Sequence, residues 1–92
     1  MSIRDFENIS PLIAASAYVD ESALVIGGVS IDEDASLWPM VVARGDVNTI
    51  HIGARTNIQD GSILHVSHDS EFAAGGFALH IGADVTVGHR AV

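Results

Sequence analysis

The sequence predicts an all-β fold, a parallel β-solenoid built from six-residue units, and three observations support it. Aliphatic residues recur at every sixth position along most of the chain, the residue two positions earlier is almost always small or β-branched, and short polar runs separate these sites. An α-helix turns by about 100° per residue, so a period of six would scatter the aliphatic residues around it. The sites are Ile13, Val19, Val25, Ile31, Leu37, Ala43, Ile52, Ile58, Leu64, Ile81 and Val87.

Each six-residue unit is expected to form one short strand and one corner, with two alternate side chains pointing inward. The polar runs DESA and DEDAS fall between aliphatic sites and are expected to be solvated corners. Glycine follows the aliphatic residue at 53, 82 and 88, and we expect a positive φ there because glycine adopts it without strain. The second inward position is occupied by Ala17, Ala23, Val29, Ala35, Val41, Ile50, Thr56, Ser62, Leu79 and Val85.

The 92 residues suit one domain. We expect an N-terminal lead-in over 1–12 and six-residue coils over 13–92. The period changes phase twice, near 44–51 and 65–80, where the chain is expected to leave the coil. The second of these excursions is polar and contains glycine, which is typical of a loop that projects from a solenoid. Functional residues are therefore expected near both excursions.

Composition narrows the possible partners. Twelve acidic residues stand against four basic residues, giving a net charge of −8, which disfavours nucleic acid and anionic membranes. The chain has no cysteine, so disulfides and thiolate metal sites are excluded. The start MSIRDFENIS carries charges where a signal peptide needs an apolar stretch, and no run reaches membrane-spanning length. We therefore expect a cytoplasmic protein.

A specific family resemblance is carried by WPMVVARGDVNTIHIGARTNIQDGSILHV and, after a loop, by HIGADVTVGH. These stretches resemble the γ-class carbonic anhydrase-like proteins of the hexapeptide-repeat superfamily, since RGD, NIQDG, LHV and VGH occur in the same order at compatible spacing. The likeness runs from about Val25 to Val92. It implies a left-handed parallel β-helix, a homotrimer, and a Zn²⁺ ion, or Fe²⁺ or Co²⁺, held by three histidines at each subunit interface.

The resemblance also implies an activity, that of a carbonic anhydrase-like lyase (carbonate dehydratase) that hydrates CO₂ reversibly with metal-bound hydroxide. Within this chain it assigns His65 and His89 as metal ligands. The family's third histidine would fall at position 94, beyond Val92. The β-helix is accordingly expected to be truncated before its last coils and C-terminal helix, and its activity is expected to be weak or absent in this form.

Counting three units to a coil, as the resemblance implies, stacks Arg44 directly beneath His65. The same count stacks Asp60 beneath His89, on a different wall of the prism. The two histidines are then expected to meet only if a neighbouring subunit brings its His89 to His65. Arg44 and Asp60 are expected to form a charge-assisted pair across that interface.

The candidate catalytic residues are Asp46 and Gln59, which match family residues that orient the metal's water or the substrate through hydrogen bonds. His51, His68 and His80 match no ligand of the family. His51 and His80 are expected to face outward from strands, whereas His68 lies in the second excursion and would at most assist proton transfer.

Two other functions remain open at this stage. The first is a non-catalytic role as a metal-binding module or assembly scaffold. The second, less favoured, is a hexapeptide acyltransferase, which shares the solenoid and the trimer but uses a catalytic histidine with an acyl-CoA donor. Acyltransferases do not need RGD and NIQDG paired with two histidines on facing walls, so that combination favours the carbonic anhydrase-like function.

Overall fold

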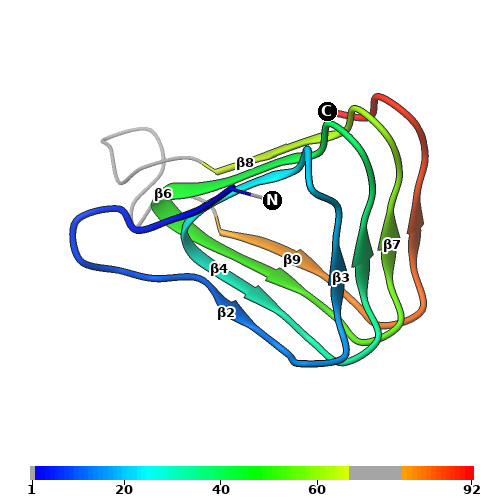
Figure 1. Cartoon of the computed structure of the whole chain (residues 1–92), viewed down its shortest axis with the longest axis horizontal. Helices are drawn as coiled ribbons and strands as arrows, with labels where there is room; N and C mark the ends of the chain where they lie inside the picture. The colour runs from blue at the N-terminus through cyan, green and yellow to red at the C-terminus, as the bar shows by residue number, and fades with distance from the viewer. Residues whose placement is uncertain (1, 67–77) are drawn as a thin grey trace.

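The computed structural model describes residues 2–66 and 78–92, which coil into a solenoid of triangular cross-section (Figure 1). Every ladder between its strands is parallel, and the described residues contain no helix. The predicted fold class, a left-handed parallel β-helix, is confirmed. Its strands are β1 (Ser2–Arg4), β2 (Leu12–Ile13), β3 (Tyr18–Val19), β4 (Leu24–Ile31), β5 (Ser36–Leu37), β6 (Val42–Ile52), β7 (Asn57–Ile58), β8 (Ile63–His65), β9 (Leu79–Ile81) and β10 (Thr86–Val87).

Three walls enclose the core. Wall A contains β1, the first half of β4, the first half of β6, and β8. Wall B contains β2, the second halves of β4 and β6, and β9, so these two long strands each pass around the corner from wall A to wall B. Wall C contains β3, β5, β7 and β10 and forms the right-hand side of Figure 1. The predicted lead-in over 1–12 thus includes β1, which pairs with β4.

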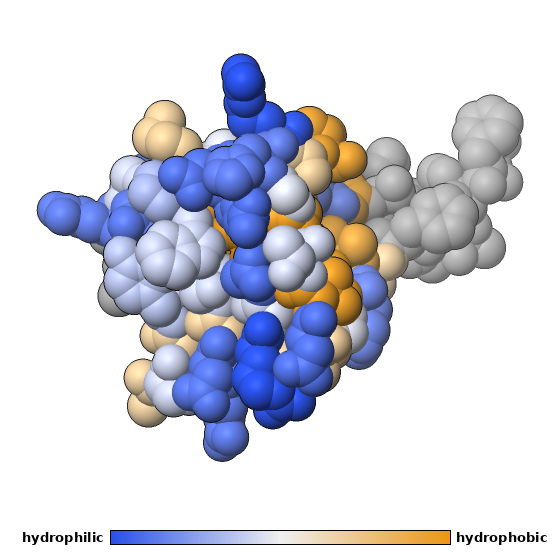
Figure 2. All heavy atoms as spheres, turned by 90° about the vertical axis from the view of Figure 1, so that its right-hand side faces the viewer, coloured by the Kyte–Doolittle hydropathy of each residue, from blue (hydrophilic) through white to orange (hydrophobic). Residues whose placement is uncertain are grey.

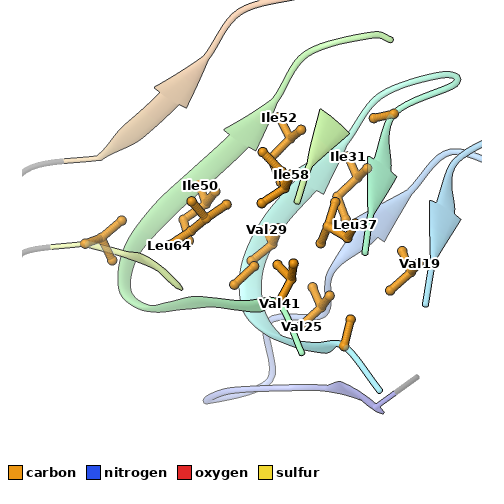
Figure 3. Packing of buried hydrophobic residues seen from close by; sticks show 14 residues of the cluster. Val19, Val25, Val29, Ile31, Leu37, Val41, Ile50, Ile52, Ile58 and Leu64 are labelled. Carbon is orange, nitrogen blue, oxygen red and sulfur yellow. The ribbon is translucent and has the colours of Figure 1, made fainter. Parts of the chain in front are cut away.

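The core consists of the two inward positions that the six-residue pattern predicts. Leu37 is stacked between Val19 and Ile58 by the parallel register of wall C, and all three point into the interior (Figure 3). Thr56 and Ser62 are the buried polar side chains among the described residues. Their hydroxyl groups donate to the backbone oxygens of Gly82 and Gly88 in the next coil, so neither is left without a partner.

The expectation of positive φ at residues 53, 82 and 88 is wrong. The left-handed residue of most corners comes two positions later, three residues after the aliphatic site. Apart from Gly61, these positions hold residues other than glycine, which shows that the corner geometry overrides the ordinary preference for glycine. The residues are Asp34, Met40, Arg55, Gly61, Asp84 and Arg90.

Two of these corner residues are linked across successive coils. Arg55 donates from Nε and Nη2 to the two carboxylate oxygens of Asp84, at 2.7 and 3.0 Å. The hydrogen bond lowers the pKa of Asp84 and raises that of Arg55. Since both side chains are more than half exposed, solvent screens the pair and it contributes little to stability.

Glycine at 53 is required by close packing between coils. A Cβ at this position would lie 2.5 Å from the carbonyl carbon of Gly82 in the coil above, whereas a Cβ at Gly82 would have nothing within 4 Å. We therefore expect Gly53→Ala to lower the free energy of unfolding of the 92-residue chain by about 1–3 kcal/mol. Gly82→Ala, the matched control, should have little effect in urea unfolding. Equal losses from both variants would contradict this packing argument.

The first predicted excursion is visible within β6. Gly27 pairs with Gly45 and Val29 with Ile50, so residues 46–49 of β6 stand where β4 has only Gly28. These extra residues bulge out at the corner between walls A and B. The second predicted excursion falls largely on residues 67–77, including His68, which lie outside the described residues.

No helix in the described part of the chain has the length and apolar character needed to cross a membrane. The cytoplasmic location stays a prediction.

Candidate functional site

Arg44, Asp46 and His65 form a cluster at the corner between walls A and B. Arg44 of β6 pairs with His65 of β8, which confirms the predicted stacking. Nη2 of Arg44 lies 2.9 Å from Nε2 of His65. The carboxylate of Asp46 lies 3.7 Å from Nε of Arg44 and 3.9 Å from Nε2 of His65. Asp46 is 16% exposed, while the other two side chains are nearly half exposed.

The contact with Arg44 favours one tautomer of the His65 ring. A guanidinium group has only donors, so in this hydrogen bond Nε2 of His65 is the acceptor and the ring proton sits on Nδ1. The Nε2 lone pair of His65 then points toward Arg44. Histidine binds a metal through the same lone pair of an unprotonated ring nitrogen.

This tautomer can be tested without any metal. In the metal-free 92-residue chain, long-range ¹H–¹⁵N NMR spectra should show His65 with its proton on Nδ1. Arg44→Ala removes the donor and should shift the ring toward the Nε2–H form. Arg4→Ala is the matched control, because Arg4 occupies the same outward column of wall A at the far end of the sheet and should leave the spectrum of His65 unchanged. A proton on Nε2 in the unmodified chain would contradict the geometry.

A second group lies at the corner between walls C and A. The pairing of Ile58 with Val87 places Asp60 beneath His89, as predicted, and the amide of Arg90 donates to the backbone oxygen of Asp60 at 2.9 Å. An open groove lies here, lined by Pro39, Met40, Asp60, Gly61, His89 and Arg90. Within 2–66 and 78–92, the carboxylate of Asp60 has neither a hydrogen bond nor an ion pair.

Gln59 belongs to this second corner, not to the cluster around Asp46. Its backbone N–H donates to the backbone oxygen of Val87 at 2.9 Å, and its side-chain nitrogen lies 3.3 Å from Oδ1 of Asn57. The two predicted catalytic residues are thus divided between corners, Asp46 beside His65 and Gln59 two residues after β7 begins, close to the Asp60 position.

One chain does not bring His65 and His89 together. His65 ends β8 in wall A, whereas His89 follows β10 of wall C. Among the residues described, no group of three or more His, Cys, Asp and Glu side chains could hold a metal ion. The donor atoms suit zinc, since imidazole is a common zinc ligand, but each corner supplies one imidazole. The histidines fit a metal only if two subunits share it.

Wall A, which connects the two corners, has an apolar outer face. Its outward positions carry aliphatic side chains on three successive strands, and Ile63 is 43% exposed. The outward positions of wall C are mainly polar, and Figure 2, which faces this wall, shows mostly hydrophilic and intermediate surface. The sequence did contain a signal for this apolar face, an aliphatic residue directly before the inward residues Val25, Ala43 and Leu64, but the six-residue pattern considers inward positions alone. The outward aliphatic residues of wall A are Leu24, Ile26, Val42 and Ile63, and the same face also carries Ser2, Arg4, Arg44 and His65.

His51 and His80 face outward from wall B, as predicted. They occupy paired positions of β6 and β9, and their rings stack with centroids 4.7 Å apart and planes 15° apart. His51 also contacts Ser30 and Asp32. Sequence reasoning missed these contacts, although the same six-residue register places Ser30 beneath His51.

A parallel β-solenoid of six-residue units with histidines at two corners defines a hexapeptide-repeat protein. No protein-family model matches the sequence. Protein YrdA of Escherichia coli is 50% identical over 88 residues, which cover 96% of this chain and 48% of that protein. Gamma carbonic anhydrase 1, mitochondrial, of Arabidopsis thaliana is 45% identical over 83 residues, which cover 90% of this chain and 30% of that protein.

The fold has a close counterpart in the crystal structure of a hexapeptide transferase family protein from Anaplasma phagocytophilum. The TM-score is 0.82 at 34% sequence identity, and the match covers 96% of this chain and 47% of that one. Over nearly its whole length, the chain is similar to γ-carbonic anhydrase-like proteins and to hexapeptide-repeat structures. It spans about half the length of the bacterial relatives it matches and about a third of the plant one.

Proposed function

We propose that this chain forms part of a γ-carbonic anhydrase-like metal site at the interfaces of a homotrimer, where CO₂ is reversibly hydrated. The observation that carries the proposal is the position of His65 and His89 at the two corners that flank the apolar wall A. A metal shared between subunits would join these corners, and the wall between them would be covered by the same assembly.

Each corner carries both signs of charge, Arg44 with Asp46 at one and Asp60 with Arg90 at the other. Arg44 and Asp60 can pair across an interface, since the carboxylate of Asp60 has no partner within the described residues. When different patches of identical subunits bind each other head to tail, the assembly closes into a ring if the rotation allows. A triangular prism that joins one corner to another suits a ring of three subunits.

Assembly would also free the metal ligand. In the single chain Arg44 donates to a neutral imidazole, whereas Asp60 of the partner subunit offers it a full negative charge. Charge-assisted hydrogen bonds to carboxylates are roughly twice as strong as neutral ones. Arg44 is therefore expected to turn from His65 to the partner's Asp60, leaving the Nε2 lone pair of His65 available.

Zn²⁺ is the proposed metal, with Fe²⁺ or Co²⁺ as alternatives, held by His65, His89 of the partner subunit and a third histidine. The amide of Ile63 donates to the backbone oxygen of Ala91 at 2.8 Å, so the last described residues return to wall A above β8. The same register supports a residue at position 94 above His65. A bound zinc ion supplies Lewis acidity that brings the pKa of water close to neutral.

The polar residues at the two corners have separate tasks in this proposal. The carboxylate of Asp46, held 3.9 Å from Nε2 of His65, accepts a hydrogen bond from water and orients it. The side-chain amide of Gln59 donates to an oxygen of CO₂ or bicarbonate. Its present contact with Asn57 is long, at 3.3 Å, so the donor is readily given up.

Metal content tests this function directly. The 92-residue chain is compared with a chimera extended past residue 92 by the corresponding segment of the Escherichia coli relative, and bound zinc is measured by mass spectrometry. We expect about one zinc per extended chain, weaker binding by the short chain, and near-complete loss in His65→Ala or His89→Ala. His80→Ala, which removes an exposed histidine of wall B, should retain the metal.

CO₂ hydration by the extended chain, measured by stopped flow, distinguishes an enzyme from a metal-binding scaffold. Activity that appears with extension and disappears with either histidine would support catalysis. Stoichiometric zinc without hydration would support the scaffold. An extended chain that binds no metal would contradict the proposal as a whole.

A hexapeptide acyltransferase is the second candidate, favoured by the structural neighbour described as a hexapeptide transferase. It predicts binding of acetyl-CoA by the extended chain without any metal, which calorimetry would detect. The carbonic anhydrase-like function predicts no such binding.

A further inference from the structure

We propose that Ser30, His51 and Asp32 form a second site on wall B, in which Ser30 is a nucleophile that cleaves small, activated carboxylic esters. These residues lie outside the site described above. They come from paired positions of β4 and β6 and from the residue that follows β4. The proposal does not depend on a metal or on the proposed trimer.

The contacts follow the order nucleophile, base and orienting carboxylate. Oγ of Ser30 lies 2.9 Å from Nδ1 of His51, and Nε2 of the same ring lies 3.3 Å from Oδ2 of Asp32. A carboxylate can only accept, so Asp32 favours the tautomer with the ring proton on Nε2, in which Nδ1 presents its lone pair to the hydroxyl of Ser30. This is the polarity of a serine hydrolase triad, with the two ring nitrogens exchanged.

The ring of His51 is held in place from one side. His80 stacks against it at a centroid distance of 4.7 Å, which restricts rotation of the His51 plane. The side chain of His51 is 35% exposed and that of Asp32 is 51% exposed, so solvent weakens the pair but also reaches the site. These features favour a modest rate enhancement.

Ser30 also lines two adjoining hollows on wall B. One is lined by the apolar side chains of Ile9 and Leu12 together with the hydroxyl-bearing residues Ser10 and Thr49. The other continues past Leu12 to Asp32. Leu12 is 73% exposed and Ile9 is 55% exposed, which leaves apolar surface beside the nucleophile. A short apolar acyl group suits this surface.

A hydroxyl donor is available for the developing oxyanion. Thr49 lines the same hollow as Ser30, and in the described part of the chain its hydroxyl group has no hydrogen-bond partner. Donors aimed at a developing negative charge are among the larger contributions to acyl transfer. Thr49 is therefore assigned to this role.

The reaction proceeds in two balanced stages. Oγ of Ser30 forms a bond to the ester carbonyl carbon and passes its proton to Nδ1 of His51. The bond to the leaving alcohol then breaks, and the alcohol takes this proton, leaving acyl-Ser30. Water attacks the acyl group, again giving a proton to His51, and the carboxylic acid leaves as Ser30 recovers its proton.

The test uses p-nitrophenyl acetate with the 92-residue chain after treatment with a chelator. We expect acetylation of the peptide that contains Ser30, identified by mass spectrometry, and release of p-nitrophenol. Ser30→Ala and His51→Gln should each lower the rate by about 100-fold, in line with the loss of a nucleophile or its base. Asp32→Asn lies on an exposed corner, does not threaten folding, and should also lower the rate.

Ser36→Ala provides the control, because it removes an outward-facing serine of wall C, away from Ser30 and His51, and should leave ester cleavage unchanged. A rate that Ser30→Ala does not alter, or acetyl groups found only on other residues, would overturn the proposal. A rate that is absent after chelation and returns only when zinc is added to the unmodified chain would also overturn the proposal and would assign ester cleavage to the metal site.

Discussion

Chains carrying His65→Ala, mixed with chains carrying His89→Ala, are expected to regain zinc that neither variant binds alone. The two histidines lie at different corners of one chain, so an intact interface needs His65 from one subunit and His89 from the next. In a mixed trimer some interfaces receive both. With equal amounts and random exchange, about one quarter of the interfaces should be intact.

The experiment uses the extended chain, with the two variants co-expressed and the trimers separated by gel filtration before metal analysis. The control mixes His65→Ala with the double variant His65→Ala/His89→Ala. That mixture contains no His65, so it should bind no zinc. Equal zinc in both mixtures would show that the metal is held elsewhere. Failure of the first mixture, with normal zinc in the unmodified trimer, would place both ligands within one subunit.

The core positions follow from the six-residue repeat, and the stacking of the site residues follows once the family resemblance supplies three units to a coil. This count places Leu37 on Val19 and, with the phase shift of the first excursion, His65 on Arg44. Inward positions are under a strong hydrophobic constraint, so they stay visible in a single sequence. The relation between neighbouring coils is therefore readable without coordinates.

Corner conformation was less predictable. The position of glycine suggested left-handed residues at 53, but the left-handed residue of that corner is Arg55, and Gly53 is needed for the approach of Gly82. A glycine can be required because the backbone adopts a positive φ or because another backbone segment approaches too closely for a Cβ, and a single sequence does not distinguish the two causes. Only the arrangement of successive coils distinguishes them.

Side-chain contacts on the outer walls were also difficult to foresee. The register places Ser30 beneath His51, but the contact with Asp32 depends on how the corner after β4 directs that carboxylate. The apolar outer face of wall A was missed for another reason. In a chain that is 48% hydrophobic, an aliphatic residue such as Ile63 next to an inward site is not distinctive until each residue is assigned to its wall.

The second large effect is expected from Leu37→Ala. Leu37 is fully buried in wall C, with Val19 in the coil below and Ile58 in the coil above. Backbone hydrogen bonds join these coils on both sides, so the neighbouring side chains cannot move in to fill the space. Substitutions of this kind cost about 2–5 kcal/mol, and the higher values occur where the cavity does not collapse.

Urea unfolding at a fixed protein concentration measures this loss, with Leu12→Ala as the matched control because Leu12 is a strand leucine that is 73% exposed. We expect the control to change the free energy of unfolding by less than about 0.5 kcal/mol. The coils contact one another mainly as nearest neighbours, so a cavity at Leu37 should weaken the coils on both sides and lower the cooperativity of unfolding as well as its midpoint. A loss no greater than that of Leu12→Ala would mean that the stacked core does not provide the stability of the solenoid.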